Sequence, residues 1–184
     1  DTEGFIYVNG GSGIVDNTGN SDKSMINKGI IYVDGANVKV EDTQIGYTTG
    51  HWYGAVGMLY RLDAVTGDGN TVENSGTITA VNGAVGVVLR NDDDTNLRNN
   101  NAFNNKKFSN AGTIEARNNA TALYIADTEN ARIINTGTIS ADADSIALQV
   151  ANATATLVGG AKSEVEGLIK VLGGSELTFS GTNN

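Results

Sequence analysis

The sequence contains no cysteine, no proline and a single histidine, His51. Without cysteine there is no disulfide and no thiolate metal site. Without proline no residue lacks a backbone N–H group, which suits a chain in which most residues donate to a neighbouring strand. One histidine leaves one possible base for a Ser-His-Asp triad, and no serine stands in a nucleophile-elbow sequence. We therefore predict no catalytic site and no enzyme activity.

Basic residues are also scarce: 12 Lys and Arg stand against 21 Asp and Glu, for a net charge of -9. This balance disfavours nucleic acid or an anionic membrane as a partner, because neither supplies countercharge. No apolar run approaches the length of a membrane span, and the opening residues DTEGFIYVNGG do not resemble a signal peptide. We expect this segment not to insert into a membrane.

The sequence contains a repeated motif instead. NSGTI begins at Asn74, NAGTI at Asn110 and NTGTI at Asn135, and a weaker copy, NKGII, begins at Asn27. Apolar residues alternate with polar ones after each glycine, and a period of two indicates β-strands. The copies align on their glycines, Gly29, Gly76, Gly112 and Gly137, and Gly4 and Gly167 fit the same pattern without the asparagine. An isoleucine stands two residues after each of these glycines, at positions Ile6, Ile31, Ile78, Ile114, Ile139 and Ile169. Nine residues further on the apolar residues are Val15, Val40, Val87, Leu123 and Leu148.

Each repeat therefore reads as three short strands joined by tight turns. Such a unit cannot bury its apolar face alone, but stacked units can. We predict an all-β fold, a right-handed parallel β-helix of roughly seven three-strand coils, two of them between Gly29 and Gly76. GAVGMLYRL, from Gly54, matches GAVGVVLRN, from Gly83, and supplies the second strand of one coil. An antiparallel sandwich is the alternative, but it does not explain the repeated phrase.

The Asn-x-Gly element has an expected role in the turns. Asparagine tolerates the left-handed conformation, stacked asparagine amides can bond one another along the rod, and glycine takes a positive φ at little cost. Thr77, Thr113 and Thr138 would form an outward row, which resembles an ice-binding face. That row is broken by three apolar residues, Phe5, Ile30 and Leu168.

The chain is expected to be one β-helical segment, residues 1–184, with insertions near residues 46–54 and 91–107. The second insertion is rich in asparagine and reads as a loop. Its acidic start, Asn91–Asp94, lacks the spaced ligands and terminal glutamate of an EF-hand loop. A solvated acidic loop is preferred over a calcium site, and we predict no metal and no cofactor.

The phrase Asn-x-Gly-Thr-Ile, followed by Ala-x-x-Leu-x-Val, resembles the passenger domains of bacterial autotransporters (type V secretion), most of all the self-associating adhesins. The resemblance covers nearly the whole chain. It implies a stalk outside the outer membrane of a Gram-negative bacterium, at the cell surface or secreted. In that family a signal peptide precedes the passenger and a membrane β-barrel follows it; neither is present here, so we expect an excised segment. Exoproteins of two-partner secretion share similar repeats. The Gly-Asp-Ser-Gly sequence of the protease branch is absent.

These features predict an adhesin segment acting in bacterial aggregation, biofilm formation or host attachment, and so in virulence. Its partner would be a host glycan, a matrix protein or a like chain. Two alternatives remain. One is a polysaccharide-degrading β-helix enzyme, a lyase, hydrolase or tailspike-like protein, which needs two acids facing across a groove. The other is a passive spacer.

The partner site is predicted on the second strand of the coils. If Val87 and Leu123 point inward, their neighbours form an outward row, Lys39, Leu59, Val88, Tyr124 and Gln149, with Met58 and Tyr60 inward. A loop carrying His51, Trp52 and Tyr53 and the asparagine-rich loop 91–107 flank this row. Loops beside an apolar stripe predict a shallow binding groove. The alternative is that the asparagine-rich loop lies across the stripe and keeps it dry.

Overall fold

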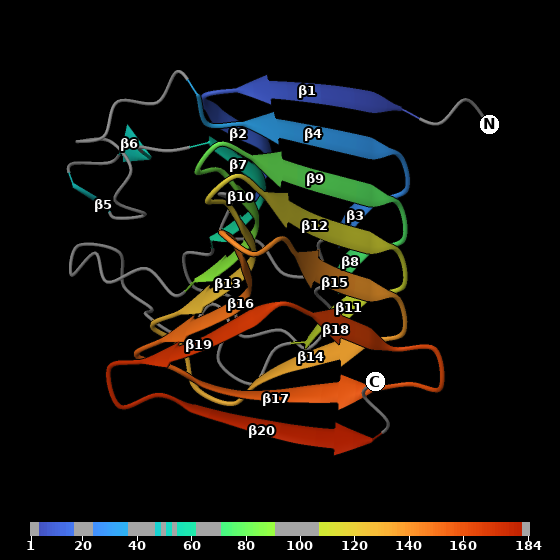
Figure 1. The fold of residues 1–184 in the computed structure, drawn as a ribbon, viewed down its shortest axis with the longest axis vertical. Helices are drawn as coiled ribbons and strands as arrows, with labels where there is room; N and C mark the ends of the chain where they lie inside the picture. The colour runs from blue at the N-terminus through green and yellow to red at the C-terminus, as the bar shows by residue number, and fades with distance from the viewer. Residues whose placement is uncertain are drawn as a thin grey trace.

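A computed structural model of the chain describes residues 4–16, 24–36, 47–48, 51–52, 55–61, 71–90 and 107–181. These ranges form strands and turns, and they contain no helix that could cross a membrane. The strands stack into a rod with the N-terminus at one end and the C-terminus towards the other (Figure 1). The predicted all-β fold is confirmed.

Three parallel sheets of six strands each form the walls of the rod. The first sheet contains β1 (Phe5–Asn9), β4 (Ile30–Asp34), β9 (Thr77–Val81), β12 (Thr113–Arg117), β15 (Thr138–Ala141) and β18 (Glu164–Glu166). The second contains β2 (Gly11–Asp16), β7 (Ala55–Arg61), β10 (Val85–Arg90), β13 (Thr121–Ala126), β16 (Ile146–Ala151) and β19 (Leu168–Leu172). The third contains β3 (Ser24–Asn27), β8 (Thr71–Asn74), β11 (Lys107–Asn110), β14 (Ala131–Asn135), β17 (Thr154–Gly159) and β20 (Glu176–Gly181).

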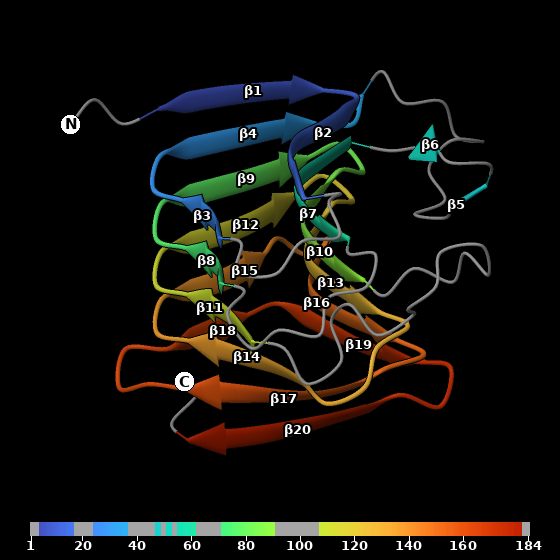
Figure 2. The ribbon, with the colours of Figure 1, turned by 180° about the vertical axis from the view of Figure 1, so that it is seen from behind.

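The chain visits the three sheets in turn, so each set of three strands is one coil of a right-handed parallel β-helix (Figures 1 and 2). The described residues form six coils, not the predicted seven. The difference lies between Gly29 and Gly76. β4 pairs directly with β9, so this segment is one coil whose extra residues lie between its strands. Part of the insertion is a short antiparallel pair, β5 (Tyr47–Thr48) and β6 (His51–Trp52).

Inward side chains of equivalent strands stack into apolar columns. Ile78, Ile114 and Ile139 pair in register along the first sheet and are fully buried, as the spacing predicted. Met58 and Tyr60 also point into the main core, as predicted from the match between β7 and β10. Because each inward side chain of the inner coils lies between equivalent side chains of two other coils, the core is continuous along the rod.

Two positions in the predicted register are wrong. Ile14, not Val15, pairs with Met58 and packs against the main core, while Val15 is exposed. Ile169 does not continue the first sheet: it pairs with Leu148 in the second, and Val165 takes the expected place beside Ile139. The first error arises because the adjacent apolar residues Ile14 and Val15 leave the inward member of the strand undecided without its partner. The second arises because the alignment on Gly167 assigns the following strand to the first sheet, whereas Ile169 points inward from the second.

The asparagines of Asn-x-Gly form a buried ladder along the corner between the third and first sheets. The side-chain Nδ2 of Asn27 donates to Oδ1 of Asn74 at 2.8 Å, Asn74 to Asn110 at 2.8 Å, and Asn110 to Asn135 at 2.9 Å. The last amide donates to Oγ of Ser163 at 3.0 Å. The predicted bonding of stacked amides is confirmed, but these asparagines are not among the left-handed residues of the described chain.

The glycines of this element also lack the predicted positive φ. They are required for close approach instead. A Cβ on Gly76 would collide with the carbonyl oxygen of Gly29, one on Gly112 with that of Gly76, and one on Gly137 with that of Gly112. Only a residue without a side chain lets the backbones of successive coils meet at this corner.

Left-handed asparagines instead occupy the other corners. Asn82 and Asn118 follow first-sheet strands with φ of 56°. Nδ2 of Asn82 donates to Oδ1 of Asp34 at 2.8 Å, and the backbone N–H of Asn118 donates to Oδ2 of Asp142 at 2.9 Å. The Asn82 bond, with help from the Ala36 N–H, lowers the pKa of Asp34. The pKa of Asp142 is lowered chiefly by a side-chain hydrogen bond with Ser145, and then by the Asn118 N–H.

Both ends of the described rod are open. β1, β2 and β3 stand at one edge of their sheets and β18, β19 and β20 at the other. In the last coil the inward residues Val171 and Phe179 are exposed, because no described coil packs beneath them.

Candidate functional site

The row predicted on the second sheet exists, but it is not an exposed groove. Leu59, Val88, Tyr124 and Gln149 pair in register, and the row continues to Val15 at one end. The predicted exposure is wrong for its middle: Leu59 and Val88 are both 0% exposed. With Val56 and Val85 they form a second cluster, separate from the main core. The burial agrees with the alternative in which the stripe is covered.

Tyr124 is the partly exposed member of this row and packs against the second cluster. Burial raises the pKa of Tyr124, and the nearby carboxylate of Asp127 raises it further, while Arg90 opposes both effects. Nε of Arg90 lies 3.1 Å from Oδ2 of Asp127. Tyr124 therefore stays neutral at physiological pH and offers a hydroxyl beside an ion pair.

The other predicted site residues are only partly within the described chain. His51 and Trp52 lie on β6, where His51 pairs with Thr48 and Trp52 with Tyr47. Tyr53 and Lys39 lie outside the described residues, as does most of the asparagine-rich loop 91–107 with its acidic start. The structure thus brings together Leu59, Val88, Tyr124 and Gln149, and the pairing of the two loops with this row stays a prediction.

An exposed apolar surface occurs elsewhere, on the outer face of the first sheet. Phe5 on β1 pairs with Ile30 on β4, and Tyr7 pairs with Tyr32 on the same two strands. Phe5 is 65% exposed, Tyr7 54% and Ile30 40%. The rings of Tyr7 and Tyr32 stack with centroids 5.9 Å apart and planes inclined by 16°. We call these four residues the aromatic patch.

The aromatic patch ends abruptly at the third coil. Thr77 and Thr79 take the positions of Ile30 and Tyr32, and the first row then continues through Thr113 and Thr138. In the same two rows, Glu115, Glu164 and Glu166 lie beyond the threonines. These two rows therefore change along the rod from aromatic through hydroxyl-bearing to acidic, while a third row of the same face carries Asp34 and Arg117.

The sequence contained the signal for this patch. Phe5 and Ile30 appear in it as interruptions of the threonine row, whereas they are the neighbours that make the patch contiguous. Leu168, the third supposed interruption, lies on the second sheet instead. Exposed apolar residues that are contiguous mark an interaction site more reliably than single ones do.

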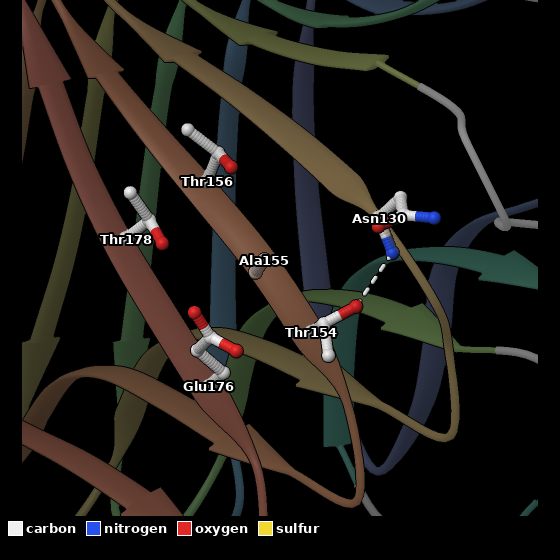
Figure 3. Close-up of a pocket in the computed structure, with 6 residues that line it drawn as sticks. All are labelled: Asn130, Thr154, Ala155, Thr156, Glu176 and Thr178. Atoms are coloured by element: carbon white, nitrogen blue, oxygen red, sulfur yellow. Dashed lines mark hydrogen bonds between the residues drawn. The ribbon is translucent and has the colours of Figure 1, made fainter.

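A third feature is a polar hollow of about 150 Å³ on the outer face of the third sheet, lined by threonine, asparagine and glutamate side chains (Figure 3).

No group of three His, Asp or Glu side chains in the described ranges is placed to hold a metal ion. Comparison with protein-family models, with characterised proteins and with solved structures finds no match to this chain.

Proposed function

We propose that this chain is an adhesive segment of a surface-exposed or secreted bacterial protein, in which a rigid β-helical rod presents binding surfaces to another cell or to a host. The observation that carries the proposal is the aromatic patch. Three large apolar side chains stand exposed on a flat, hydrogen-bonded sheet, where their burial in the rod's own core is impossible. A passive spacer has no need of such a surface.

The rigidity of the platform supports the same function. β4, which carries Ile30 and Tyr32, is paired on both sides, with β1 and β9, and the asparagine ladder begins immediately before it, at Asn27. This half of the patch therefore loses little conformational entropy when a partner binds, which favours affinity. Tyrosine and phenylalanine supply large contact areas with few rotatable bonds, as binding hot spots do.

The resemblance to autotransporter passengers supports a location outside a Gram-negative outer membrane and a role in aggregation, biofilm formation or host attachment. The partner would be a host glycan, a matrix protein or a like chain, and the segment would act without catalysis, metal or cofactor. Its net charge of -9 agrees with a partner other than nucleic acid.

The test displays the chain on non-adherent bacteria and measures aggregation, together with binding to glycan and matrix-protein arrays. The variant replaces Phe5, Tyr7 and Ile30 by threonine, the residue that occupies both rows in the third coil. Adhesion should fall at least tenfold while the melting temperature of the purified chain is unchanged. A matched control, Thr77→Ser with Thr79→Ser, should leave adhesion intact.

Full adhesion of the folded triple variant would contradict the proposal. Release of new reducing ends from a polysaccharide by the unmodified chain would favour the enzyme alternative instead.

A further inference from the structure

The polar hollow on the third sheet is a concave site on the outer face of the described part of the rod. Its lining residues are Asn130, Thr154, Ala155, Thr156, Glu176 and Thr178. They come from three successive coils: Asn130 stands immediately before β14, the next three lie at the start of β17, and the last two lie on β20. Figure 3 shows the threonine and glutamate side chains projecting from the same side of β17 and β20.

The parallel register sets the spacing of these side chains. Thr154 pairs with Glu176, and Thr156 pairs with Thr178. Neighbouring strands lie about 4.8 Å apart, and alternate residues of one strand about 6.6 Å apart. Four polar side chains therefore stand near the corners of a small rectangle, with buried Ala155 beneath them.

Most of the hydrogen-bonding capacity of this rectangle is unused. Oγ1 of Thr154 accepts a hydrogen bond from the backbone N–H of Asn130 at 2.8 Å, which orients the hydroxyl and leaves its hydrogen free to donate. Among the described residues, the side chains of Thr156, Glu176 and Thr178 have no hydrogen-bond or ion-pair partner. The hollow thus offers hydroxyls that donate and accept, and a carboxylate that only accepts.

This set of groups selects a ligand with many hydroxyls and no charge. A single carboxylate is too few ligands for a metal ion. It also repels anions, as does the net charge of -9. Arg132 is exposed and pairs with Thr156 from β14, but it is not part of the lining. The hollow, at about 150 Å³, is well below the size of a site for a drug-sized ligand, about 300–1,000 Å³.

We propose that this hollow is a low-affinity subsite for one neutral hexose unit of a glycan. Sugar hydroxyls donate to the carboxylate of Glu176 and exchange hydrogen bonds with the hydroxyls of Thr156 and Thr178. For a ligand of about 12 non-hydrogen atoms, ordinary ligand efficiency corresponds to a Kd of about 2 mM. The site lies on a different sheet from the aromatic patch, so it goes beyond the adhesive function proposed above.

The test is a titration of the isotope-labelled chain with the methyl glycosides of glucose, galactose and mannose, followed by amide chemical shifts. At least one glycoside should shift amides of β17 and β20 and saturate in the millimolar range. The double variant Thr156→Val with Thr178→Val removes two hydroxyls and keeps a β-branched shape, so it should raise Kd at least tenfold. Glu176→Gln should weaken binding less, because the amide still accepts.

A matched control replaces Thr113 and Thr138, which pair in the same way on the first sheet, by valine. It should leave Kd unchanged. Three results would overturn the proposal: no saturable shift with any glycoside, equal affinity in the Thr156/Thr178 variant with an unchanged melting temperature, or tighter binding of glucuronate than of glucose. The first two leave adhesion through the aromatic patch untouched, because its variants are assayed separately.

Discussion

Removing one amide from the asparagine ladder tests what holds the coils in register. Asn110 is fully buried, donates to Oδ1 of Asn135 at 2.9 Å and accepts from Nδ2 of Asn74 at 2.8 Å. Asn110→Ala removes these two amide–amide bonds, worth about 0.5–1.5 kcal/mol each, and leaves Oδ1 of Asn135 without its donor, at about 1–3 kcal/mol, while Nδ2 of Asn74 keeps the carbonyl oxygens of Gly76 and Thr113 as acceptors. The sum is about 2–6 kcal/mol of the free energy of unfolding.

Urea unfolding followed by far-UV circular dichroism measures this loss. With an m-value of about 2 kcal/mol/M, the midpoint should fall by about 1–3 M. Ser109→Ala is the control, because Ser109 is the outward neighbour on the same strand and should change stability by about 0.5 kcal/mol or less. Equal midpoints for the two variants would refute the argument that the ladder stabilises the stack.

Asn110→Asp extends the test with a pH dependence. A carboxylate cannot donate to Asn135, and burial disfavours its charge, so the introduced group should have a raised pKa. Its protonated form can donate one hydrogen bond. The stability deficit relative to the unmodified chain should therefore be largest at neutral pH and shrink as the pH falls through that raised pKa. A deficit independent of pH would mean that the position is hydrated.

Three further changes probe other parts of the rod. Gly112→Ala places a Cβ against the carbonyl oxygen of Gly76 and should either prevent folding or lower the melting temperature sharply; wild-type behaviour in calorimetry would exclude the close approach. Leu59→Asp buries a charge in the second cluster and should cost at least about 3 kcal/mol in urea unfolding, whereas lost adhesion at unchanged stability would restore the exposed-groove hypothesis. The pKa of Asp142 is lowered, chiefly by its hydrogen bond with Ser145, so its contribution is present above the unfolded value, near 3.8, and is lost as pH falls through the lower folded value. The melting temperature of the Asp142→Asn variant should therefore fall less at acid pH than that of the unmodified chain. An equal fall in both proteins would count against that hydrogen bond.

The sequence predicted the features that depend on periodicity. The column through Ile114 follows from the spacing of the repeated phrase, and the match of β7 with β10 correctly placed Met58 and Tyr60 in the core. Coil number was overestimated because a spacing of two repeats, Gly29 to Gly76, can equally be one repeat with an insertion. The spacing of the repeats gives only the number of residues between them, whereas the pairing of β4 with β9 shows which of those residues belong to a sheet.

The candidate site could be predicted only in part. The outward direction of Leu59 and Val88 follows from the alternation, but their burial depends on what lies over the outer face, which alternation does not encode. The asparagines were expected at turns, where they tolerate the left-handed conformation, and their amides were expected to bond one another along the rod; that bonding is confirmed, but the burial was not predicted. Their partners are amides one coil away, so their burial becomes visible only when the coils are stacked. The hollow at Thr156 likewise depends on residues of separate coils.

The asparagine ladder also bears on how such a rod changes length during evolution. Each amide donates to the next coil, each amide after Asn27 also accepts from the previous coil, and each glycine makes room for the backbone of the coil before it. The unit is therefore complementary to itself, so any coil carrying it can follow any other. Duplication or loss of a whole coil by recombination leaves every remaining contact of this corner intact, whereas a single substitution disturbs two neighbours. Rod length is then freer to vary between lineages than the Asn-x-Gly element that joins its coils.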